Sequence, residues 1–266
     1  MTFEARRVKV NSWNVNGIRA AAKKGFLDWV RAEDADIICL QETKARKEQL
    51  EPTLQEIRDS RDMPYHCFYA SAKRPGYSGT ALFAREEPLS VSLLGVPEFD
   101  DEGRYIEADF STYAVASAYF PNSQEGGARL DYKLRYCEAV LCRAKELASR
   151  GKHLILSGDY NIAHTPIDLY HPKENEGNPG YLPEERDFMT KFLASGFADV
   201  FRRFHEGEPG HYTWWSYRTR AREKDIGWRL DYHCVNEAFF GNIKETSIQK
   251  AVLGSDHCPI QLVLEL

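Results

Sequence analysis

The sequence predicts an α/β fold: a four-layer α/β/β/α sandwich of two packed mixed β-sheets flanked by helices. Three observations support this fold class. Seven or more short apolar runs have the pattern of strands, whereas few stretches have helical periodicity. The helical stretches carry an apolar stripe that a sheet must cover, so the helices are expected to form the outer layers. The two halves of the chain also resemble each other weakly, each running from a strand to a helix and then to several strands.

The first half begins with an alternating strand and a helical stretch. Residues 8–13 alternate between apolar and polar side chains, and residues 18–31 have helical spacing. A second strand is expected at 37–40, followed by a charged helix around 47–60. Residues 65–120 then form successive short strands, because Pro-Gly and Glu-Pro pairs interrupt them with turns.

The second half contains the longest predicted helix. Its apolar side chains recur at helical spacing, at Leu130, Leu134, Cys137, Leu141, Ala144 and Ala148. A strand at 154–156 and a polar loop at 163–182 follow. Another helix begins at Pro183, where two acidic residues favour a helix N-terminus. The chain closes with an alternating strand at 260–264.

Length and composition are those of one globular domain. The chain has 266 residues, of which 42% are hydrophobic and 28% charged. No linker rich in Pro, Gly or Ser divides it, so residues 1–266 are expected to form a single domain. No apolar run approaches the roughly 20 residues that span a bilayer, and the N-terminus lacks an apolar signal core. The six cysteines form no CxxC pair, which favours reduced thiols and a cytoplasmic location.

The distribution of charge matters more than its sum. The net charge of −5 disfavours a nucleic-acid partner at first sight. Basic residues nevertheless outnumber acids at 218–229, and a second basic group lies at 19–44. Such runs are usually solvated faces. Here Trp214, Trp215 and Trp228 flank the first cluster, a combination typical of a groove that follows a nucleic-acid backbone.

Acidic residues stand at the ends of apolar strands. Glu42 follows one such run, and Asp159 follows another with Asn161 two residues on. Asp256 and His257 lie near the end of the chain. In open α/β sheets, ligands bind beyond the carboxyl ends of the strands. Gathered acids need a cation or a proton, so these strand ends predict a divalent metal site with a histidine, which is hydrolase chemistry.

Each signature has an ordinary explanation when taken alone. Asn-Val-Asn-Gly at 14–17 is a common turn, and Glu42 beside Lys44 is a common surface ion pair. An Asp-His pair such as 256–257 is usually incidental, whereas Gly-Asp-Tyr-Asn at 158–161 places an acid and an amide on the same side of a loop. Their joint occurrence is what indicates a site.

Together the motifs resemble one known family. The chain resembles the exonuclease III / apurinic-apyrimidinic endonuclease branch of the endonuclease–exonuclease–phosphatase superfamily, over nearly its whole length. The motifs that carry the resemblance are Trp-Asn-Val-Asn-Gly at 13–17, Leu-Gln-Glu-Thr-Lys at 40–44, Gly-Tyr-Ser-Gly at 76–79, Tyr-Phe-Pro-Asn at 119–122, Gly-Asp-Tyr-Asn-Ile-Ala at 158–163, Leu-Pro-Glu-Glu-Arg at 182–186, the Trp-rich block at 212–232 and Gly-Ser-Asp-His-Cys-Pro-Ile at 254–260. The block at 212–232 is specific to this branch.

The resemblance implies a DNA-repair endonuclease. Such an enzyme hydrolyses the phosphodiester bond 5′ to an abasic site in double-stranded DNA by metal-assisted attack of water, and leaves a 3′-hydroxyl. Accessory 3′-5′ exonuclease and 3′-phosphatase activities are implied as well. The expected cofactor is Mg²⁺, with Mn²⁺ as a substitute. A monomer, associated with the nucleoid through DNA and independent of membranes, is also implied.

The resemblance also assigns metal ligands. Glu42 resembles the principal magnesium ligand, and Asn14 and Asp256 resemble residues near the ion, directly or through water. Asp159 resembles the residue that orients and deprotonates the attacking water, or alternatively holds a second metal together with Asn161.

Further residues resemble catalytic groups around the phosphate. Asn161 and Tyr119 resemble hydrogen-bond donors to the reacting phosphate. His257 resembles the imidazole that contacts a non-bridging oxygen, and Asp231 the carboxylate that holds it. An acid beside an imidazole fixes its tautomer and supports its charged form.

DNA contacts are implied at the aromatic block and at the basic groups. Trp214, Trp228 and Leu230 resemble the walls of a pocket for a flipped-out deoxyribose without its base; core aromatics bridging two strands are the alternative. The remaining DNA contacts are expected at Arg19, Lys44, Tyr77, Asn122 and Arg222.

The chain departs from the family pattern at two places. Asn16 stands where some members carry Asp, which removes one charge beside the metal. The loop at 122–125 reads Asn-Ser-Gln-Glu, where some members insert a basic side chain into DNA. We expect the second departure to lower the affinity for duplex DNA and to speed up product release.

Two other function classes account for part of the sequence. A superfamily phosphatase acting on a small phosphoester would explain the acids, Asn161 and His257, but leaves the Trp214–Trp228 block without a purpose. A non-catalytic DNA-binding module would tolerate loss of acids near DNA, and this chain keeps them. Cleavage of a duplex with one abasic site discriminates among the three.

Overall fold

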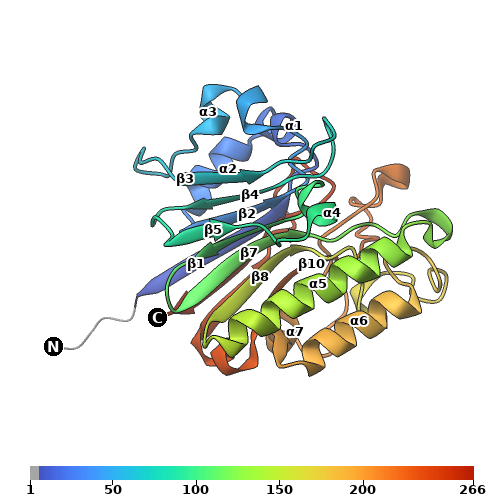
Figure 1. Ribbon diagram of the computed structural model, residues 1–266. Helices are drawn as coiled ribbons and strands as arrows, with labels where there is room; N and C mark the ends of the chain where they lie inside the picture. The colour runs from blue at the N-terminus through green and yellow to red at the C-terminus, as the bar shows by residue number, and fades with distance from the viewer. Residues whose placement is uncertain (1–5) are drawn as a thin grey trace.

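The computed structural model describes residues 6–266 and consists of two six-stranded sheets packed face to face (Figure 1). Helices cover the outer face of each sheet, so the four-layer α/β/β/α prediction is confirmed. Each sheet contains one central parallel pair, and its other neighbouring strands are antiparallel.

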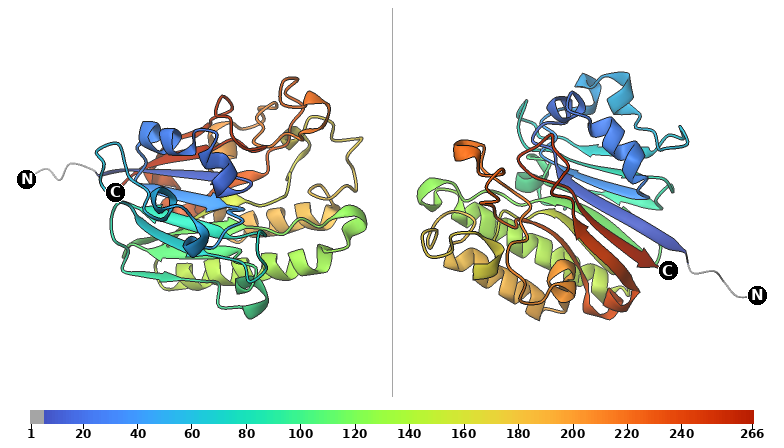
Figure 2. Two further views of the ribbon diagram at one scale, coloured as in Figure 1. Left: turned by 90° about the horizontal axis from the view of Figure 1, so that it is seen from above. Right: turned by 180° about the vertical axis from the view of Figure 1, so that it is seen from behind.

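The first sheet has the order β11-β12-β1-β2-β4-β3. Its strands are β1 (Arg7–Asn14), β2 (Ile37–Gln41), β3 (His66–Ala70), β4 (Thr80–Ala84), β11 (Ile243–Ile248) and β12 (Ile260–Glu265). Strands β1 and β2 form the parallel pair. Figure 2 shows β1 beside β12, so the two ends of the chain close this sheet together.

The second sheet has the order β5-β6-β7-β8-β10-β9. Its strands are β5 (Ser90–Ser92), β6 (Tyr105–Asp109), β7 (Tyr113–Tyr119), β8 (His153–Asp159), β9 (Phe197–Asp199) and β10 (Asp231–Asn236). Strands β7 and β8 form its parallel pair. The repetition of one parallel pair per sheet is the structural basis of the weak resemblance between the halves.

Helices of unequal length cover the two sheets. The α-helices are α1 (Ile18–Ala22), α2 (Phe26–Glu33), α3 (Pro52–Gln55), α4 (Pro97–Asp100), α5 (Leu130–Ser149), α6 (Pro183–Ala194) and α7 (Val200–Phe204). Short 3₁₀ turns lie at Lys47–Gln49, Glu125–Gly127, Pro166–Asp168, Arg218–Arg220 and Glu237–Asn242. None of the helices within 6–266 is long and apolar enough to cross a membrane.

Three apolar clusters fill the spaces between the layers. One lies between the sheets and includes Val10, Leu82 and Ile155. A second packs α1 and α2 on the first sheet, with Phe26 and Trp29 at its centre. The third packs α5 and α6 on the second sheet. Burial of these side chains from water is the main force that holds the layers together.

Two helical predictions need correction. The stretch 18–31 is not one helix, because it breaks before Gly25, which has a φ of 94°. The charged helix expected around 47–60 is also wrong: only a 3₁₀ turn and α3 form there. Beyond α3, the Asp59 carboxylate accepts hydrogen bonds from the backbone N–H groups of Arg61 and Met63 at 2.9 Å. Such local bonds compete with helical ones.

The ends of the two parallel pairs meet at one edge of the sandwich. Asn14 ends β1 and donates from Nδ2 to Asp159 Oδ2, at the end of β8, at 2.9 Å. Gln41 ends β2 and donates from Nε2 to Ser117 Oγ of β7 at 3.0 Å. Strand ends from both sheets therefore face a common site, as expected for ligand binding in α/β proteins.

Candidate active site

Asp159 lies at the centre of the site and is almost fully buried. Its Oδ2 accepts from Asn14 Nδ2 at 2.9 Å and from Asn161 Nδ2 at 3.1 Å. Its Oδ1 accepts from the backbone N–H of Asn161 at 2.8 Å. Asn161 adopts a positive φ of 50°, a sparsely populated conformation that turns its amide back toward Asp159. The carboxylate is therefore fixed by donors from both sheets.

His257 forms a buried pair with Asp231. Its Nδ1 lies 2.8 Å from Asp231 Oδ2, and its Nε2 lies 3.8 Å from Asp159 Oδ2. Ser255 holds the segment, because its hydroxyl donates to the Asn14 carbonyl at 2.8 Å. The contact inferred between Asp231 and His257 is thus present, and it leaves Nε2 facing Asp159.

Burial and charge set the protonation of this group. Burial raises the pKa of Asp159 to about 7, although the charge of His257 opposes the rise. Burial also disfavours a charged imidazole, but Asp231 and Asp159 outweigh it and raise the pKa of His257 to about 10. Burial and the nearby Glu42 raise the pKa of Tyr119 well above its usual value, so Tyr119 stays a phenol that can donate.

Glu42 and Asp256 form the second acidic part of the site. The ammonium of Lys44 lies 3.0 Å from Glu42 Oε1 and also donates to Asn16 Oδ1. Asn16 Nδ2 in turn donates to Asp256 Oδ1 at 2.9 Å. Asn16, Glu42 and Lys44 all have positive φ values. Strained backbone of this kind clusters at functional sites.

Aromatic side chains wall a cavity of about 230 Å³ beside these acids. Trp214 and Trp228 meet edge to face, with ring centroids 6.2 Å apart, and Leu230 packs against them. Trp214 Nε1 donates to Asp256 Oδ2 at 3.1 Å, which ties the wall to the acids. The cavity is lined by Glu42, Tyr119, Asn122, Asp159, Asn161, Pro179, Gly180, Trp214, Trp228, Leu230 and Asp256.

The donor set suits a hard divalent cation. Glu42, Asp159 and Asp256 offer carboxylate oxygens to one cavity, and Asn161 adds an amide. Oxygen ligands of this kind are those that Mg²⁺ prefers. A second group of possible donor atoms, from Asp159, Asp231 and His257, lies within 4.8 Å of one another, but the raised pKa of His257 keeps its imidazole protonated and unable to bind a metal at neutral pH. The positive charges in contact with these acids come from Lys44 and His257.

Some expected DNA contacts lie outside the cavity lining. Arg19 is exposed on α1, whereas Tyr77 is partly buried. The Tyr77 hydroxyl accepts from Arg104 Nη2 at 2.8 Å and from Arg129 Nη1 at 2.6 Å. The Lys44 ammonium forms an ion pair with Glu42, next to the acidic residues of the site. Asn122 does line the cavity and donates to Asn161 Oδ1 at 3.2 Å.

Two basic residues of the 218–229 cluster, Arg222 and Arg229, form hydrogen bonds and ion pairs within the protein. Arg222 Nη1 donates to the Ser255 carbonyl at 2.9 Å, and Nη2 donates to the carbonyls of Lys250 and Val252. Its guanidinium also lies 4.7 Å from the Trp215 ring centroid. Three backbone carbonyls thus give Arg222 a structural role, and the phosphate contact expected at this residue stays a prediction. Arg229 is fully buried on Asp168 and Asp199.

Sequence reasoning missed the ion pair beneath Asn161. Lys133 Nζ donates to the Asn161 carbonyl at 2.6 Å and to Glu185 Oε1 at 2.7 Å, and both charged side chains are fully buried. Ser123 Oγ donates to the same carboxylate at 2.5 Å. The sequence does place Lys133 on the apolar face of the helix predicted at 130–148. A lysine buried there needs an acidic partner, so its position could have indicated a buried ion pair.

Carboxylates, amides and a carboxylate-bound imidazole, gathered at the strand ends of a two-sheet sandwich, define the class: a hydrolase that attacks phosphate esters. The chain belongs to the Endonuclease/Exonuclease/phosphatase family, whose sequence profile matches residues 12–257. The family predicted from the motifs is therefore confirmed.

Individual relatives cover the chain almost completely. An exodeoxyribonuclease of Bacillus subtilis is 45% identical over 97% of this chain and 100% of its own length. A DNA repair nuclease of Danio rerio is 43% identical over 98% of this chain and 83% of its own length. The solved structure of an AP endonuclease from Leishmania major has a TM-score of 0.87 at 26% identity, covering 98% of this chain and 88% of that one. These names agree with the nuclease function expected from the motifs.

Proposed function

We propose that this chain is a DNA-repair nuclease that hydrolyses the phosphodiester bond 5′ to an abasic site in duplex DNA and leaves a 3′-hydroxyl. One observation carries the proposal: the Asp159–His257–Asp231 group adjoins an aromatic cavity of about 230 Å³. Hydrolytic groups beside an aromatic pocket suit a phosphodiester whose neighbouring sugar has lost its base. The names of the relatives support the same substrate class.

Asp159 is the proposed general base. Its pKa of about 7 lies near neutral pH, where a carboxylate accepts a proton from water most effectively. Asn14 and Asn161 hold both carboxylate oxygens in place. Once Asp159 has taken a proton from water, the resulting hydroxide attacks phosphorus. The bond between phosphorus and the 3′-oxygen then breaks, and the leaving oxygen takes a proton from solvent to become the 3′-hydroxyl.

His257 and Tyr119 are the proposed stabilisers of the phosphate. The pKa of His257 is raised to about 10, so the ring is protonated at neutral pH and offers Nε2–H to a non-bridging oxygen. Asp231 keeps the ring oriented through Nδ1. Tyr119 faces the same cavity and supplies a further donor. Asn161 also lines the cavity, but its Nδ2 donates to Asp159 Oδ2 and to the Phe120 carbonyl, so it donates to the phosphate only by releasing one of these bonds. These groups act on charge that grows as the hydroxide adds.

Magnesium is the proposed cofactor, with Mn²⁺ as a substitute. Glu42 is the proposed principal ligand, with Asn14 and Asp256 beside it, and Asp159 and Asn161 available for a second ion. Among residues 6–266, Asn14 Oδ1 accepts a hydrogen bond only from the Asn16 backbone N–H, which leaves a lone pair on that oxygen. When bound, the cation supplies charge that stabilises phosphate oxygens and favours ionisation of water.

Trp214, Trp228 and Leu230 are the proposed pocket for the baseless deoxyribose. Arg19, Lys44, Tyr77 and Asn122 are the proposed contacts to the DNA backbone. We infer that the chain acts as a monomer in the cytoplasm, at the nucleoid. Weaker 3′-5′ exonuclease and 3′-phosphatase activities fit the same site, and the structure of a 3′ phosphatase from Neisseria matches this chain with a TM-score of 0.83 at 25% identity.

The test is cleavage of a labelled duplex with a single abasic site, with Mg²⁺ and with excess chelator. An undamaged duplex and a chromogenic small phosphoester serve as controls. The proposal predicts magnesium-dependent incision on the 5′ side of the abasic residue, and little turnover of either control. Full activity in chelator, or preference for the small phosphoester, would contradict it.

A further inference from the structure

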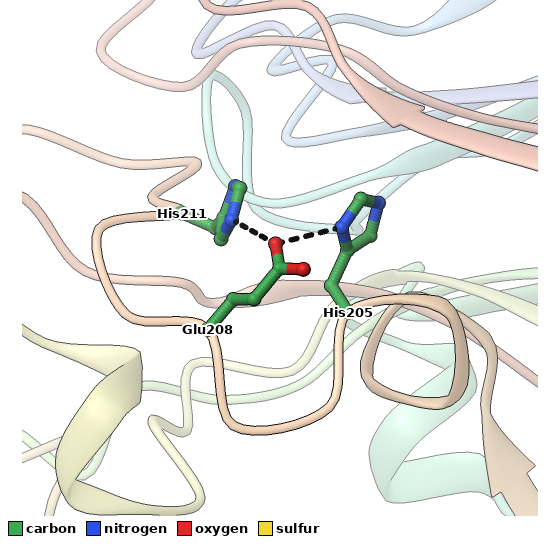
Figure 3. Close-up of side chains that lie close together, drawn as sticks. All are labelled: His205, Glu208 and His211. Atoms are coloured by element: carbon green, nitrogen blue, oxygen red, sulfur yellow. Dashed lines mark hydrogen bonds and ion pairs between the residues drawn. The ribbon is translucent and has the colours of Figure 1, made fainter.

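A second group of metal-binding side chains lies outside the active site, on the loop that follows α7. His205, Glu208 and His211 are spaced three residues apart, and Figure 3 shows both imidazoles directed at the carboxylate between them. His205 Nδ1 lies 3.0 Å from Glu208 Oε2, and His211 Nε2 lies 3.1 Å from the same oxygen. The three donor atoms all lie within 4.8 Å of one another.

These separations are close to those of a metal site. Zinc bonds of about 2.0–2.2 Å in a tetrahedron place neighbouring donor atoms about 3.3 Å apart. The two distances to Glu208 differ from this value by a few tenths of an ångström.

Neighbouring side chains hold the backbone of this loop in place. Arg202 Nη1 donates to the carbonyls of Glu208 at 2.6 Å and His205 at 3.3 Å. Arg202 is itself held by the buried carboxylate of Asp168. On the other side, Lys250 Nζ donates to the Gly210 carbonyl at 2.8 Å. The backbone that carries all three side chains is therefore held at two points before any ion arrives.

The imidazole rings are held as well. The His205 ring stacks on the buried Phe201 ring at 4.4 Å, and the His211 ring meets Phe201 edge to face at 5.0 Å. Rings fixed by packing lose less rotational freedom on binding.

We propose that His205, Glu208 and His211 form a site for a zinc-class transition-metal ion, separate from the catalytic magnesium site. Two imidazoles and one carboxylate suit Zn²⁺, Co²⁺ or Ni²⁺, whereas Mg²⁺ prefers oxygen ligands alone. Side-chain exposures of 32%, 55% and 31% leave room for water as the fourth ligand. Ions can therefore exchange with solvent.

The position of the site suggests what the ion does. His211 is followed by Tyr212, Thr213 and Trp214, which leads into the aromatic wall. Thr213 Oγ1 accepts from the backbone N–H groups of Leu230 at 2.9 Å and Asp231 at 3.1 Å. An ion that joins residues 205 and 211 closes the loop at the start of this segment. It stabilises the fold and leaves the catalytic groups untouched.

The experiment measures zinc bound per chain by equilibrium dialysis of the full chain against Zn²⁺ in a large excess of Mg²⁺, which occupies the oxygen-rich site. The variants are His205→Ala, His211→Ala and Glu208→Gln. The matched control is His171→Ala, because His171 also faces a glutamate three residues on, Glu174, at 3.9 Å, but is not part of a three-residue metal-binding group.

We expect one more zinc per chain in the wild type and in His171→Ala than in His205→Ala and His211→Ala. Glu208→Gln should weaken binding by more than the about 10-fold typical of losing an outer-sphere partner. Substituted Co²⁺ should show visible d–d absorption that the His205→Ala chain lacks. Zinc should also raise the Tm of the wild type by a few degrees and leave that of His205→Ala unchanged.

Two results would overturn the proposal. One is equal zinc content in the wild type, His205→Ala and His211→Ala. The other is an unaltered Co²⁺ spectrum in Glu208→Gln, a substitution at a half-exposed side chain that leaves folding intact. Neither result depends on nuclease activity, so the two proposals stand or fall separately.

Discussion

Asp159 and His257 illustrate how single residues acquire their chemistry from their neighbours. Asp159 accepts from Asn14 and Asn161, and His257 is held by Asp231. Their pKa values of about 7 and about 10 are displaced in directions that keep one group basic and the other protonated near neutral pH. The motifs indicated which residues belong here, but not these protonation states, because burial and distance decide them.

The first prediction separates the roles of His257 and Asp231. His257→Ala should slow single-turnover cleavage by about 10²–10⁴-fold and leave DNA affinity nearly unchanged, because the imidazole acts on the transition state. Asp231→Asn should cause a smaller loss, since the ring remains but loses its orienting carboxylate. Single-turnover rates and equilibrium DNA binding measure the two effects, with the exposed His66→Ala as the control. Additive losses in the double mutant would argue against the pairing.

The second prediction concerns pH. Cleavage should speed up as the pH rises through about 7, because Asp159 loses its proton there, and slow down near about 10, where His257 loses its own. More Mg²⁺ should shift the acidic limb to lower pH, since a nearby cation stabilises the carboxylate. Rate–pH profiles at two magnesium concentrations test this. An acidic limb that is absent, or that stays in the same place, at both magnesium concentrations would show that Asp159 is not the base.

At the scale of elements, strands were easier to predict than short helices. The strands at 8–13 and 37–40 and the long helix from 130 follow from apolar periodicity, and the structure places elements there. The helix expected around 47–60 fails because Leu50 and Glu51 are extended before Pro52, and because Asp59 bonds the backbone locally beyond α3. The basic cluster at 218–229 was only partly interpretable, because sequence spacing does not reveal that Arg222 binds backbone carbonyls and Arg229 binds buried acids.

The third prediction contrasts two arginines. Arg222→Ala should lower the free energy of unfolding by about 2 kcal/mol, because it removes hydrogen bonds from a charged donor to three carbonyls. The exposed Arg19→Ala should leave stability unchanged and lower the salt slope of DNA binding by about one unit. Urea unfolding and salt-dependent binding measure these effects. If Arg222→Ala instead lowers the salt slope of DNA binding and leaves stability unchanged, Arg222 contacts DNA and has no structural role.

The fourth prediction concerns the ion pair beneath Asn161. Lys133→Met leaves the Glu185 carboxylate buried without its cation, so a loss of about 3–5 kcal/mol is expected. Replacing both partners, as Lys133→Met with Glu185→Met, should recover the part of that loss that comes from the unpaired charge, whereas the cost of the lost hydrogen bonds to the Asn161 carbonyl and from Ser123 remains. Urea unfolding of the single and double variants provides the measurement. If the double variant is as unstable as the single one, an unpaired charge is not the cause.

At the scale of the whole molecule, residues from both sheets form one site. The carboxyl ends of both parallel pairs bring Asn14, Glu42, Tyr119 and Asp159 to a common edge, and the 212–232 segment closes the cavity beside them. Apolar patterns sufficed to predict the sandwich, and the motifs contain most of the residues that line this cavity. The buried pair Lys133–Glu185 and the contribution of Gly180 to the cavity were not predicted, because they depend on which segments the fold brings together.

The fifth prediction is that damage selectivity resides in the aromatic wall. Trp228 is partly buried and packs against Trp214 and Leu230, so Trp228→Ala enlarges the cavity without emptying a main core cluster. An enlarged cavity should also admit a nucleotide that keeps its base. Circular dichroism and thermal unfolding should show that the variant remains folded.

The decisive measurement is the ratio of cleavage rates on an abasic duplex and on the same duplex without damage, for the wild type and for Trp228→Ala. The account predicts a large ratio in the wild type and a ratio at least about tenfold smaller in the variant, which corresponds to about 1.4 kcal/mol of lost discrimination. An unchanged ratio in a folded Trp228→Ala protein would contradict it, because selectivity would then arise away from the Trp214–Trp228–Leu230 pocket.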